Sequence, residues 1–153
     1  MRMAKIIVLD DYSLFRKIVA EDLAFEGNLV AEVDEPDLIW DLVPTFDPDL
    51  VIMDLYTGGK YRWDLLGKVK DLFPRIPILI FTACPLPADP CLFKADGLVI
   101  KSSDFSELHQ TINNLLKPPL DASPLRKVPP LKRGGKRVQP SPPLLSSHPT
   151  GGI

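Results

Sequence analysis

The fold of this chain is decided by residues 51–59, which read VIMDLYTGG. An apolar run ends on one carboxylate, Asp54, and then breaks into a glycine-rich turn. A short apolar run bounded by turn residues predicts a strand buried on both faces. In an open parallel sheet, ligands bind at the carboxyl ends of such strands. Asp54 therefore stands where a reacting group would lie, although a lone aspartate at this place is more often a simple cap of the strand end.

Further apolar runs predict the other strands of a sheet, at residues 5–9, 29–33, 77–81 and 98–100. They are rich in aliphatic residues and are bounded by polar or turn-forming residues. Along the chain the runs alternate with segments of helical periodicity, which favours a parallel sheet with helices on both faces. We therefore predict an α/β fold built on a five-stranded, doubly wound parallel sheet.

Capping residues and prolines set the limits of the first predicted helices. Ser13 is placed to cap the first helix, and Gly27 stops it. Pro36 suits the first turn of a second, short helix, and Pro44 limits its length. The third helix has a clear apolar face, and Pro74 ends it.

The segment between the fourth and fifth strands is too rich in proline for an ordinary helix. At most, Asp89 caps a short helical segment that starts at Pro90 and ends before Gly97. The last helix starts with a capping box, formed by Asp104 and Glu107. The predicted fold therefore has a shortened fourth helix.

Charge and proline content divide the chain of 153 residues into two parts. Residues 1–117 carry 12 Lys and Arg against 19 Asp and Glu, a net charge of −7. Residues 118–153 carry 6 against 1, a net charge of +5, and hold nine of the 17 prolines. We predict one folded domain at 1–117 and a disordered, proline-rich basic tail at 118–153.

Composition also excludes several classes of protein. No apolar stretch reaches the ~18 residues of a membrane span, and the first residues do not form an apolar signal segment. We therefore expect a cytoplasmic location. Cys84 and Cys91 are too few for a disulfide framework or a four-ligand metal site, so both are expected as free thiols.

Polar residues follow four of the apolar runs: Asp10, Asp11, Asp54, Thr82 and Lys101. Because the carboxyl ends of parallel strands meet at one edge of a sheet, we expect these side chains to form one site. Clustered carboxylates repel one another unless a cation lies near them. Carboxylate oxygens suit Mg²⁺, and Lys101 supplies a positive charge for Asp54 or for a phosphoryl group. The plainer interpretation is a set of ordinary strand-end caps.

The chain resembles the receiver domain of bacterial two-component response regulators over residues 4–117. The resemblance rests on four motifs in order: VLDD at 8–11, IMD at 52–54, FTA at 81–83 and VIK at 99–101. Each motif is weak alone, but the ordered set at these spacings is specific. The resemblance implies a flavodoxin-like receiver fold and a phosphoryl-accepting signalling switch.

The resemblance also implies a role for each residue of the site. Asp54 would be the phosphoacceptor and would attack a phosphohistidine of a partner kinase. Thr82 and Lys101 would bind the phosphoryl oxygens. These roles agree with the physical demands of phosphoryl transfer, which needs in-line positioning and neutralisation of spreading charge.

The metal ligands follow from the same resemblance. Asp11 and Asp54 would bind Mg²⁺ directly, together with the backbone carbonyl of Tyr56. Asp10 would assist through a water molecule. Mg²⁺ is therefore the cofactor that the resemblance implies.

The expected partners are a sensor histidine kinase or phosphotransfer protein and an unidentified downstream protein, with room for a weak dimer. The 36 residues after Lys117, with their nine prolines, cannot form the DNA-binding domain of transcriptional members of the family. We do not expect a turnover enzyme. A phosphatase with an aspartate nucleophile at the first strand needs a second aspartate two residues later, and Tyr12 stands two residues after Asp10.

Three departures from the family pattern motivate a second hypothesis. Leu98 stands where the family usually has an aromatic residue, and Ser102 stands where it usually has a cis proline. A cis bond before a non-proline residue costs ~2.5–4 kcal/mol, which favours a trans Lys101–Ser102 bond without excluding a cis one. The shortened fourth helix is the third departure. The alternative function is a protein-interaction module of receiver fold that signals without phosphorylation.

Overall fold

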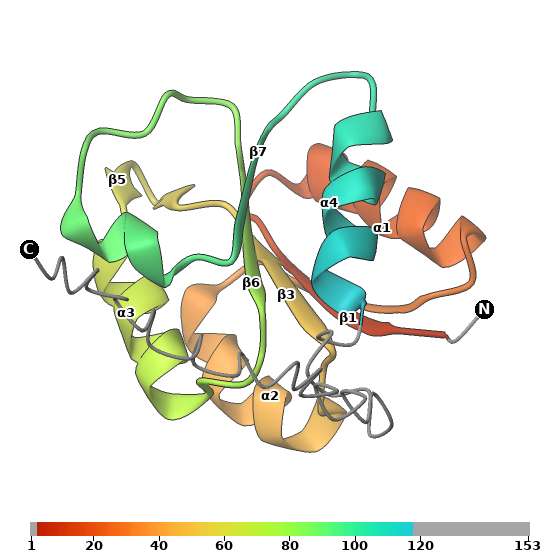
Figure 1. The fold of residues 1–153 in the computed structure, drawn as a ribbon, viewed down its shortest axis with the longest axis horizontal. Coiled ribbons are helices and arrows are strands. Elements are labelled where there is room, and N and C mark those ends of the chain that lie inside the picture. The colour runs from red at the N-terminus through yellow and green to blue at the C-terminus, as the bar shows by residue number, and fades with distance from the viewer. Residues whose placement is uncertain (1–2, 118–153) are drawn as a thin grey trace, which may run out of the picture. The chain divides into compact units, whose positions relative to one another are not determined.

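The computed structural model describes residues 3–117. Its centre is one sheet of five parallel strands (Figure 1), in the order β2-β1-β3-β6-β7. The strands are β1 (Lys5–Leu9), β2 (Leu29–Val33), β3 (Leu50–Met53), β6 (Ile78–Thr82) and β7 (Gly97–Ile100). The predicted five-stranded parallel sheet is confirmed, and β3 is its central strand.

Helices cover both faces of the sheet. The helical elements are α1 (Ser13–Phe25), the 3₁₀ turn η1 (Pro36–Leu38), α2 (Ile39–Phe46), α3 (Trp63–Leu72), the 3₁₀ segment η2 (Pro90–Lys94) and α4 (Ser106–Leu116). Figure 1 shows α1 and α4 on one face of the sheet and α2 and α3 on the other. The fold is therefore doubly wound, as predicted.

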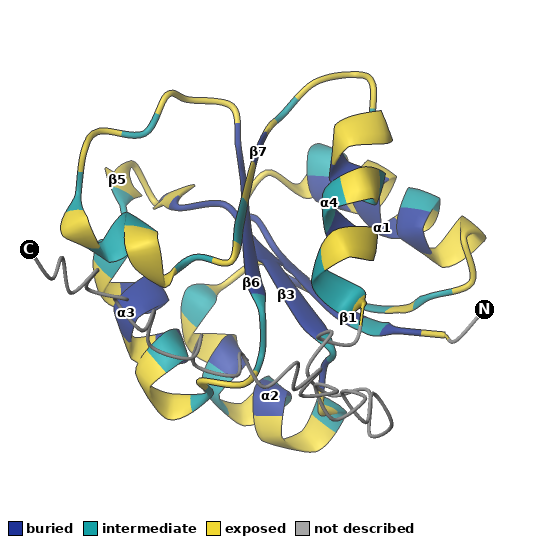
Figure 2. Ribbon diagram, viewed as in Figure 1, coloured by how far each residue is buried: buried dark blue, intermediate teal, exposed yellow. Residues whose placement is uncertain are grey.

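Two apolar layers hold these helices to the sheet, and β3 contributes to both. Val51 and Met53 pack in the layer under α2 and α3, whereas Leu50 and Ile52 pack in the layer under α1 and α4. Side chains alternate between the faces because the side-chain period of a strand is two. All of β3 is buried (Figure 2), which confirms a strand covered on both faces.

The predicted start of α1 and the predicted end of α2 were wrong. Ser13 is the first residue of α1 rather than its cap, and Tyr12 at the N-cap position makes no side-chain capping bond. The peptide N–H of Tyr12 is instead bound by the Asp10 carboxylate, at 2.9 Å. Helix α2 continues past Pro44 to Phe46. Burial of the α2 residue Val43 offsets the one backbone hydrogen bond that a proline removes.

The predicted shortening of the fourth helix is confirmed. The segment η2 forms only a 3₁₀ helix, and the Asp89 side chain accepts a hydrogen bond from the N–H of Cys91 at 2.7 Å. Gly97 does not end this segment, because η2 stops at Lys94 and Gly97 begins β7. The predicted capping box of the last helix is not formed, because the N-cap position of α4 is Phe105 and the N–H of Asp104 is bound by the Ser102 hydroxyl. Asp104 instead accepts hydrogen bonds from the N–H and hydroxyl of Ser106, at 2.8 and 2.6 Å.

After Asp54 the chain forms a β-hairpin that the sequence analysis described only as a turn. Its strands are β4 (Tyr56–Thr57) and β5 (Lys60–Tyr61), which pair antiparallel. Gly58 and Gly59 between them have φ values of 63° and 78°, in the left-handed region that a two-residue hairpin turn requires. The hairpin stands directly beside the expected phosphoacceptor.

Within residues 3–117, no helix has the length and apolar character needed to cross a membrane. The predicted basic tail at 118–153 lies outside the described residues, so its disorder remains a prediction.

Candidate functional site

The carboxyl ends of the central strands carry the predicted site. Backbone hydrogen bonds fix these ends against one another: the N–H of Asp54 donates to Leu9 O at 3.0 Å, and the N–H of Lys101 donates to Thr82 O at 2.8 Å. Asp10 follows β1 in the same way, with its N–H on Val33 O at 3.1 Å. The parallel sheet therefore brings these residues to one edge.

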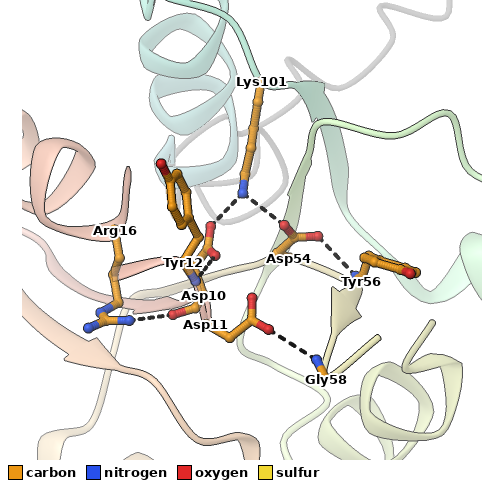
Figure 3. A network of polar contacts seen from close by, with 8 residues as sticks. All are labelled: Asp10, Asp11, Tyr12, Arg16, Asp54, Tyr56, Gly58 and Lys101. Carbon is orange, nitrogen blue, oxygen red and sulfur yellow. Dashed lines mark hydrogen bonds and ion pairs between the residues drawn. The ribbon is translucent and has the colours of Figure 1, made fainter. Parts of the chain in front are cut away.

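Lys101 joins two of the carboxylates (Figure 3). Its Nζ atom lies 2.5 Å from Asp10 Oδ2 and 2.8 Å from Asp54 Oδ2. All three side chains are nearly removed from water, with exposed fractions of 10% for Lys101, 6% for Asp10 and 10% for Asp54. Two buried carboxylates would repel one another, so the shared ammonium group makes their proximity tolerable.

The environment of Lys101 keeps it charged. Burial alone would lower the pKa of its ammonium group, but the hydrogen bonds and charges of Asp10 and Asp54 outweigh burial. The net result is a pKa above the ordinary value of 10.5. Lys101 therefore remains a cation at neutral pH and can bind anionic oxygens.

The backbone around the site satisfies the other oxygens of the two buried carboxylates. Asp54 Oδ1 accepts the N–H of Tyr56 at 2.9 Å, and Asp10 Oδ1 accepts the N–H of Tyr12 at the same distance. In both cases an aspartate binds the N–H two residues ahead, which is the Asx-turn geometry. These bonds fix the orientation of both carboxylates.

Arg16 is a supporting residue that the sequence analysis missed. Its side chain is buried on the inner face of α1, its Nη1 atom donates to Asp10 O at 2.6 Å, and its Nε atom pairs with Glu32 at 3.2 Å. The sequence does offer a sign of this role, since Arg16 stands among the apolar residues of α1. Arg16 thus holds the backbone of Asp10 through its carbonyl oxygen (Figure 3).

Asp11 differs from its neighbour because it is exposed and does not contact Lys101. Its Oδ2 atom accepts the N–H of Gly58, in the hairpin turn, at 3.0 Å. In Figure 3 its other oxygen points toward the cluster of Asp10, Lys101 and Asp54. The structure thus brings Asp10, Asp54 and Lys101 into direct contact and holds Asp11 at the rim.

Thr82 ends β6, the strand next to β3. It is 1% exposed, and its Oγ1 atom has no hydrogen-bond partner within residues 3–117. A buried hydroxyl without a partner costs free energy in the resting protein. Such a donor is ready for an acceptor that is not part of the resting fold.

The model of the response regulator receiver domain matches residues 6–113. The chain belongs to this family. Over 120 residues the receiver domain is 28% identical to the glycerol metabolism activator of Pseudomonas putida, a match that covers 74% of this chain and 54% of that protein. It is 29% identical over 80 residues to the DNA-binding transcriptional regulator NtrC of Rhizobium meliloti, covering 52% of this chain and 16% of that protein. The chain thus spans about half the length of the first relative and less of the second.

Solved response regulators share the fold. The response regulator TrrA of Thermotoga maritima, in complex with Mg²⁺ and BeF, is 27% identical with a TM-score of 0.70, covering 74% of this chain and all of TrrA (100%). TrrA in complex with the histidine kinase ThkA gives 26% identity and a TM-score of 0.69, covering 75% of this chain and 100% of TrrA. The chemotaxis regulator CheY4 of Vibrio cholerae, at 21% identity and a TM-score of 0.65 over 75% of this chain and 100% of CheY4, supports the fold alone.

The donor set of the receiver site has the chemistry that Mg²⁺ prefers. Within residues 3–117, no three His, Cys, Asp or Glu side chains form a metal cage. Mg²⁺ does not need one, because one or two carboxylates suffice and water and phosphate oxygens complete its octahedron. Asp11 has an oxygen free of the Gly58 contact, and Asp54 lies at the same strand edge. The residues present therefore fit the ion.

The receiver site forms without a cis peptide bond. No peptide bond within residues 3–117 is cis, so the Lys101–Ser102 bond is trans. The Ser102 hydroxyl donates to Asp104 O at 2.7 Å and accepts the N–H of Asp104 at 3.1 Å, which turns the chain into α4. Lys101 reaches both carboxylates from this trans backbone, so Ser102 is compatible with the lysine contacts.

The edge strand β7 carries two exposed aliphatic side chains. Leu98 and Ile100 are 43% and 48% exposed, on the edge strand β7. A pocket of about 530 Å³ is lined by Lys101 and by the apolar side chains of Phe15, Ile18 and Phe105, among others. Ile18, on α1, is 45% exposed.

Proposed function

We propose that Asp54 is the phosphoacceptor of this receiver domain. The observation that carries the proposal is the contact of one buried ammonium group with two buried carboxylates at the end of the central strands. Clusters of buried charged groups are found mainly at functional sites. An aspartate that only caps a strand end does not require a buried ammonium group or a second buried carboxylate. The buried hydroxyl of Thr82, which has no partner within residues 3–117, supports the same assignment.

In the proposed reaction an Asp54 oxygen attacks the phosphorus of a phosphohistidine. A P–O bond forms to Asp54, the P–N bond breaks, and the imidazole leaves with the electron pair. Lys101 Nζ, 2.8 Å from Asp54 Oδ2, is placed to bind a phosphoryl oxygen, and Thr82 Oγ1 supplies a second donor. Both side chains neutralise charge that spreads over the phosphoryl group in the transition state.

Mg²⁺ would supply further charge neutralisation when bound. Asp11 and Asp54 would hold it with the backbone carbonyl of Tyr56, and Asp10 would assist through water. The solved structure of TrrA with Mg²⁺ and BeF supports Mg²⁺ as the ion that this family binds.

The proposed phosphoryl donor is a cytoplasmic histidine kinase domain or a phosphotransfer protein. TrrA forms a complex with the histidine kinase ThkA, which supports a partner of this class. The output would be docking to a downstream protein, in the cytoplasm. The acyl phosphate on Asp54 would itself be the signal, and its hydrolysis would end the signal. The chain would therefore act as a switch that assists its own phosphorylation and dephosphorylation rather than as a turnover enzyme.

A direct test uses acetyl phosphate and Mg²⁺ with intact-mass measurement. We expect the wild-type protein to gain one acid- and hydroxylamine-labile phosphoryl group. Asp54→Ala should gain none, whereas Asp41→Ala, at an exposed aspartate of α2, should behave like the wild type. Failure of the wild type to form the adduct, or an equal adduct on Asp54→Ala, would reject the proposal.

A second candidate function is an interaction module that works without phosphorylation. The short segment η2 and the exposed Leu98 favour it, because both lie where the family usually transmits the state of the site. Hydrogen exchange with Mg²⁺ and beryllofluoride separates the two candidates. Binding of beryllofluoride with no change of exchange in β7 and α4 favours the module; slower exchange in these elements favours the phosphorylation switch.

A further inference from the structure

The hairpin after Asp54 is held at its base and on one side. At the base, the N–H of Arg62 donates to the carbonyl oxygen of Leu55 at 2.7 Å, and Leu55 is fully buried. At the side, the Tyr61 hydroxyl donates to Pro85 O, in the segment that follows β6, at 3.4 Å. The β4–β5 hairpin (56–61), called the arm below, is therefore held in place by two contacts and is not a free loop.

Aromatic side chains stiffen this arm. The rings of Tyr56 and Tyr61, which are paired across the hairpin, lie 5.1 Å apart in an edge-to-face arrangement. The Tyr61 ring in turn stacks on Trp63 at 6.2 Å, at the start of α3. Aromatic pairs of this kind add stability beyond the area they bury. The three rings thus connect the hairpin to a helix of the core.

The tip of the arm ends on Asp11. Gly58 has φ 63°, and from this left-handed conformation its N–H donates to Asp11 Oδ2 at 3.0 Å. The second oxygen of Asp11 faces the Asp10–Lys101–Asp54 cluster (Figure 3). One oxygen of this exposed carboxylate is thus fixed by the hairpin, and the other is presented to the site.

We propose that Gly58 is a positioning residue for the metal ligand Asp11, and that the hairpin exists to hold its N–H in place. The inference rests on the proposed function in one respect, which is that Asp11 binds Mg²⁺. Hydrogen bonds to the ligating carboxylates of metal sites orient those ligands, and their loss typically weakens metal binding by about 10–100-fold. Without the Gly58 contact, the exposed Asp11 side chain would rotate freely.

The coupling must also act in the opposite direction. If the hairpin strengthens Mg²⁺ binding through Asp11, Mg²⁺ must stabilise the closed hairpin by the same factor. The stacked ring of Trp63 then reports metal binding through its fluorescence. The chain has two tryptophans, and the other, Trp40, lies under Lys68 in a cation–π contact, so Trp40→Phe isolates the Trp63 signal.

The test is a double-mutant cycle on Mg²⁺ affinity, measured by calorimetry with the metal alone. We expect Gly58→Pro, which removes the N–H, to weaken binding by about 10–100-fold. Gly59→Ala strains the same turn but keeps the Gly58 N–H, and we expect a change of less than about 3-fold on the same scale. In an Asp11→Ala background, Gly58→Pro should have no further effect, because the N–H acts only through that carboxylate.

An equal loss from Gly58→Pro in both backgrounds would mean general damage and would overturn the inference, as would no loss at all. If Gly58→Pro fails to fold, Tyr61→Ala serves instead, since it removes the side contact of the arm; it should weaken Mg²⁺ binding in the wild type and not in Asp11→Ala. In Trp40→Phe, a Trp63 emission that does not respond to saturating Mg²⁺ would also contradict the coupling.

The outcomes separate the inference from the proposed function. If Asp54 forms a phosphoryl adduct but Gly58→Pro leaves the Mg²⁺ affinity unchanged, only the inference is rejected. Mg²⁺ affinity that depends on Gly58 through Asp11, with no adduct on Asp54, would reject the phosphoacceptor alone. An absence of Mg²⁺ binding by the wild type would reject the inference whatever Asp54 does.

Discussion

The ammonium nitrogen of Lys101 lies 2.8 Å from the carboxylate of Asp54, and the two residues are 47 positions apart in the chain. The same nitrogen binds Asp10, so one cation neutralises two buried anions. In the resting receiver domain this arrangement keeps Asp54, the proposed phosphoacceptor, oriented and partly neutralised.

Lys101→Met should lower the free energy of unfolding by about 3–5 kcal/mol at neutral pH. The substitution leaves Asp10 and Asp54 buried without their cation, and removing one partner of a buried ion pair costs this much. Urea unfolding measures the change. Lys17→Met, at an exposed lysine of α1, is the control and should change the stability by less than about 0.5 kcal/mol. Equal stability of Lys101→Met and the wild type would show that the ion pairs contribute nothing net.

The stability contribution of Lys101 should depend on pH in one direction. Its carboxylate partners outweigh burial and raise its pKa above 10.5, so protonated Lys101 favours the folded state. The contribution is then present in full below about pH 10.5 and is lost as the pH rises through the folded-state pKa. The stability difference between wild type and Lys101→Met should be constant from about pH 8 to pH 10 and shrink above it. A difference that grows at alkaline pH would have the wrong sign.

Two glycines should respond to alanine in opposite directions. Gly67 lies inside α3, where an added Cβ meets only the Lys94 Nζ atom at 3.6 Å, so Gly67→Ala should stabilise the protein by about 0.5–1 kcal/mol. At Gly97 the Cβ would come 3.0 Å from the Thr111 Cγ2 atom and 3.2 Å from Leu115, between β7 and α4. Gly97→Ala should therefore destabilise the protein by about 1–3 kcal/mol.

Thermal unfolding of the two variants checks both signs. A rescue variant tests the cause at Gly97, because Thr111→Ser removes the Cγ2 atom and keeps the hydroxyl. Combined with Gly97→Ala, it should recover part of the lost stability. If the double variant is no more stable than Gly97→Ala, the Thr111 contact is not the source of the cost.

The sheet and the main site could be predicted because both follow from local patterns and one rule of topology. Short apolar runs mark the strands, and a parallel sheet places their carboxyl ends together, so Asp10, Asp54 and Lys101 meet although they are distant in sequence. The shortened fourth helix could also be predicted from the sequence, because the prolines and the Asp89 cap limit the helix through contacts within a few residues. Predictions of this kind need no knowledge of side-chain packing.

The remaining features depend on tertiary contacts. The β4–β5 strands have two residues each, too few for any periodicity, and only the glycine pair marks their turn. The role of Arg16 depends on a backbone oxygen in another element, Asp10 O. Pro44 stays within α2 because apolar packing outweighs a lost hydrogen bond, which local propensity cannot foresee. The Gly58 contact of Asp11 belongs to the same class.

Thr82 should show a conflict between stability and function. Its buried Oγ1 atom has no partner within residues 3–117, and an unsatisfied buried hydroxyl costs about 1–3 kcal/mol. Thr82→Val keeps the shape and removes the hydroxyl, so we expect the resting protein to gain about 1 kcal/mol, measured by urea unfolding. The same variant should form less of the acetyl phosphate adduct, because a donor to the phosphoryl oxygens is lost. Thr82→Ser should keep the adduct.

Thr57 offers a matched control, since its hydroxyl is also buried and has no partner within the described part of the chain. Thr57→Val should give a similar gain in stability, but its adduct yield should stay at the wild-type level. The contrast isolates the position of the hydroxyl from the general effect of removing a buried polar atom. If Thr82→Val and Thr57→Val form the adduct equally well, the Thr82 hydroxyl does not contact the phosphoryl group. Phosphoryl binding would then not explain why this hydroxyl is buried without a partner.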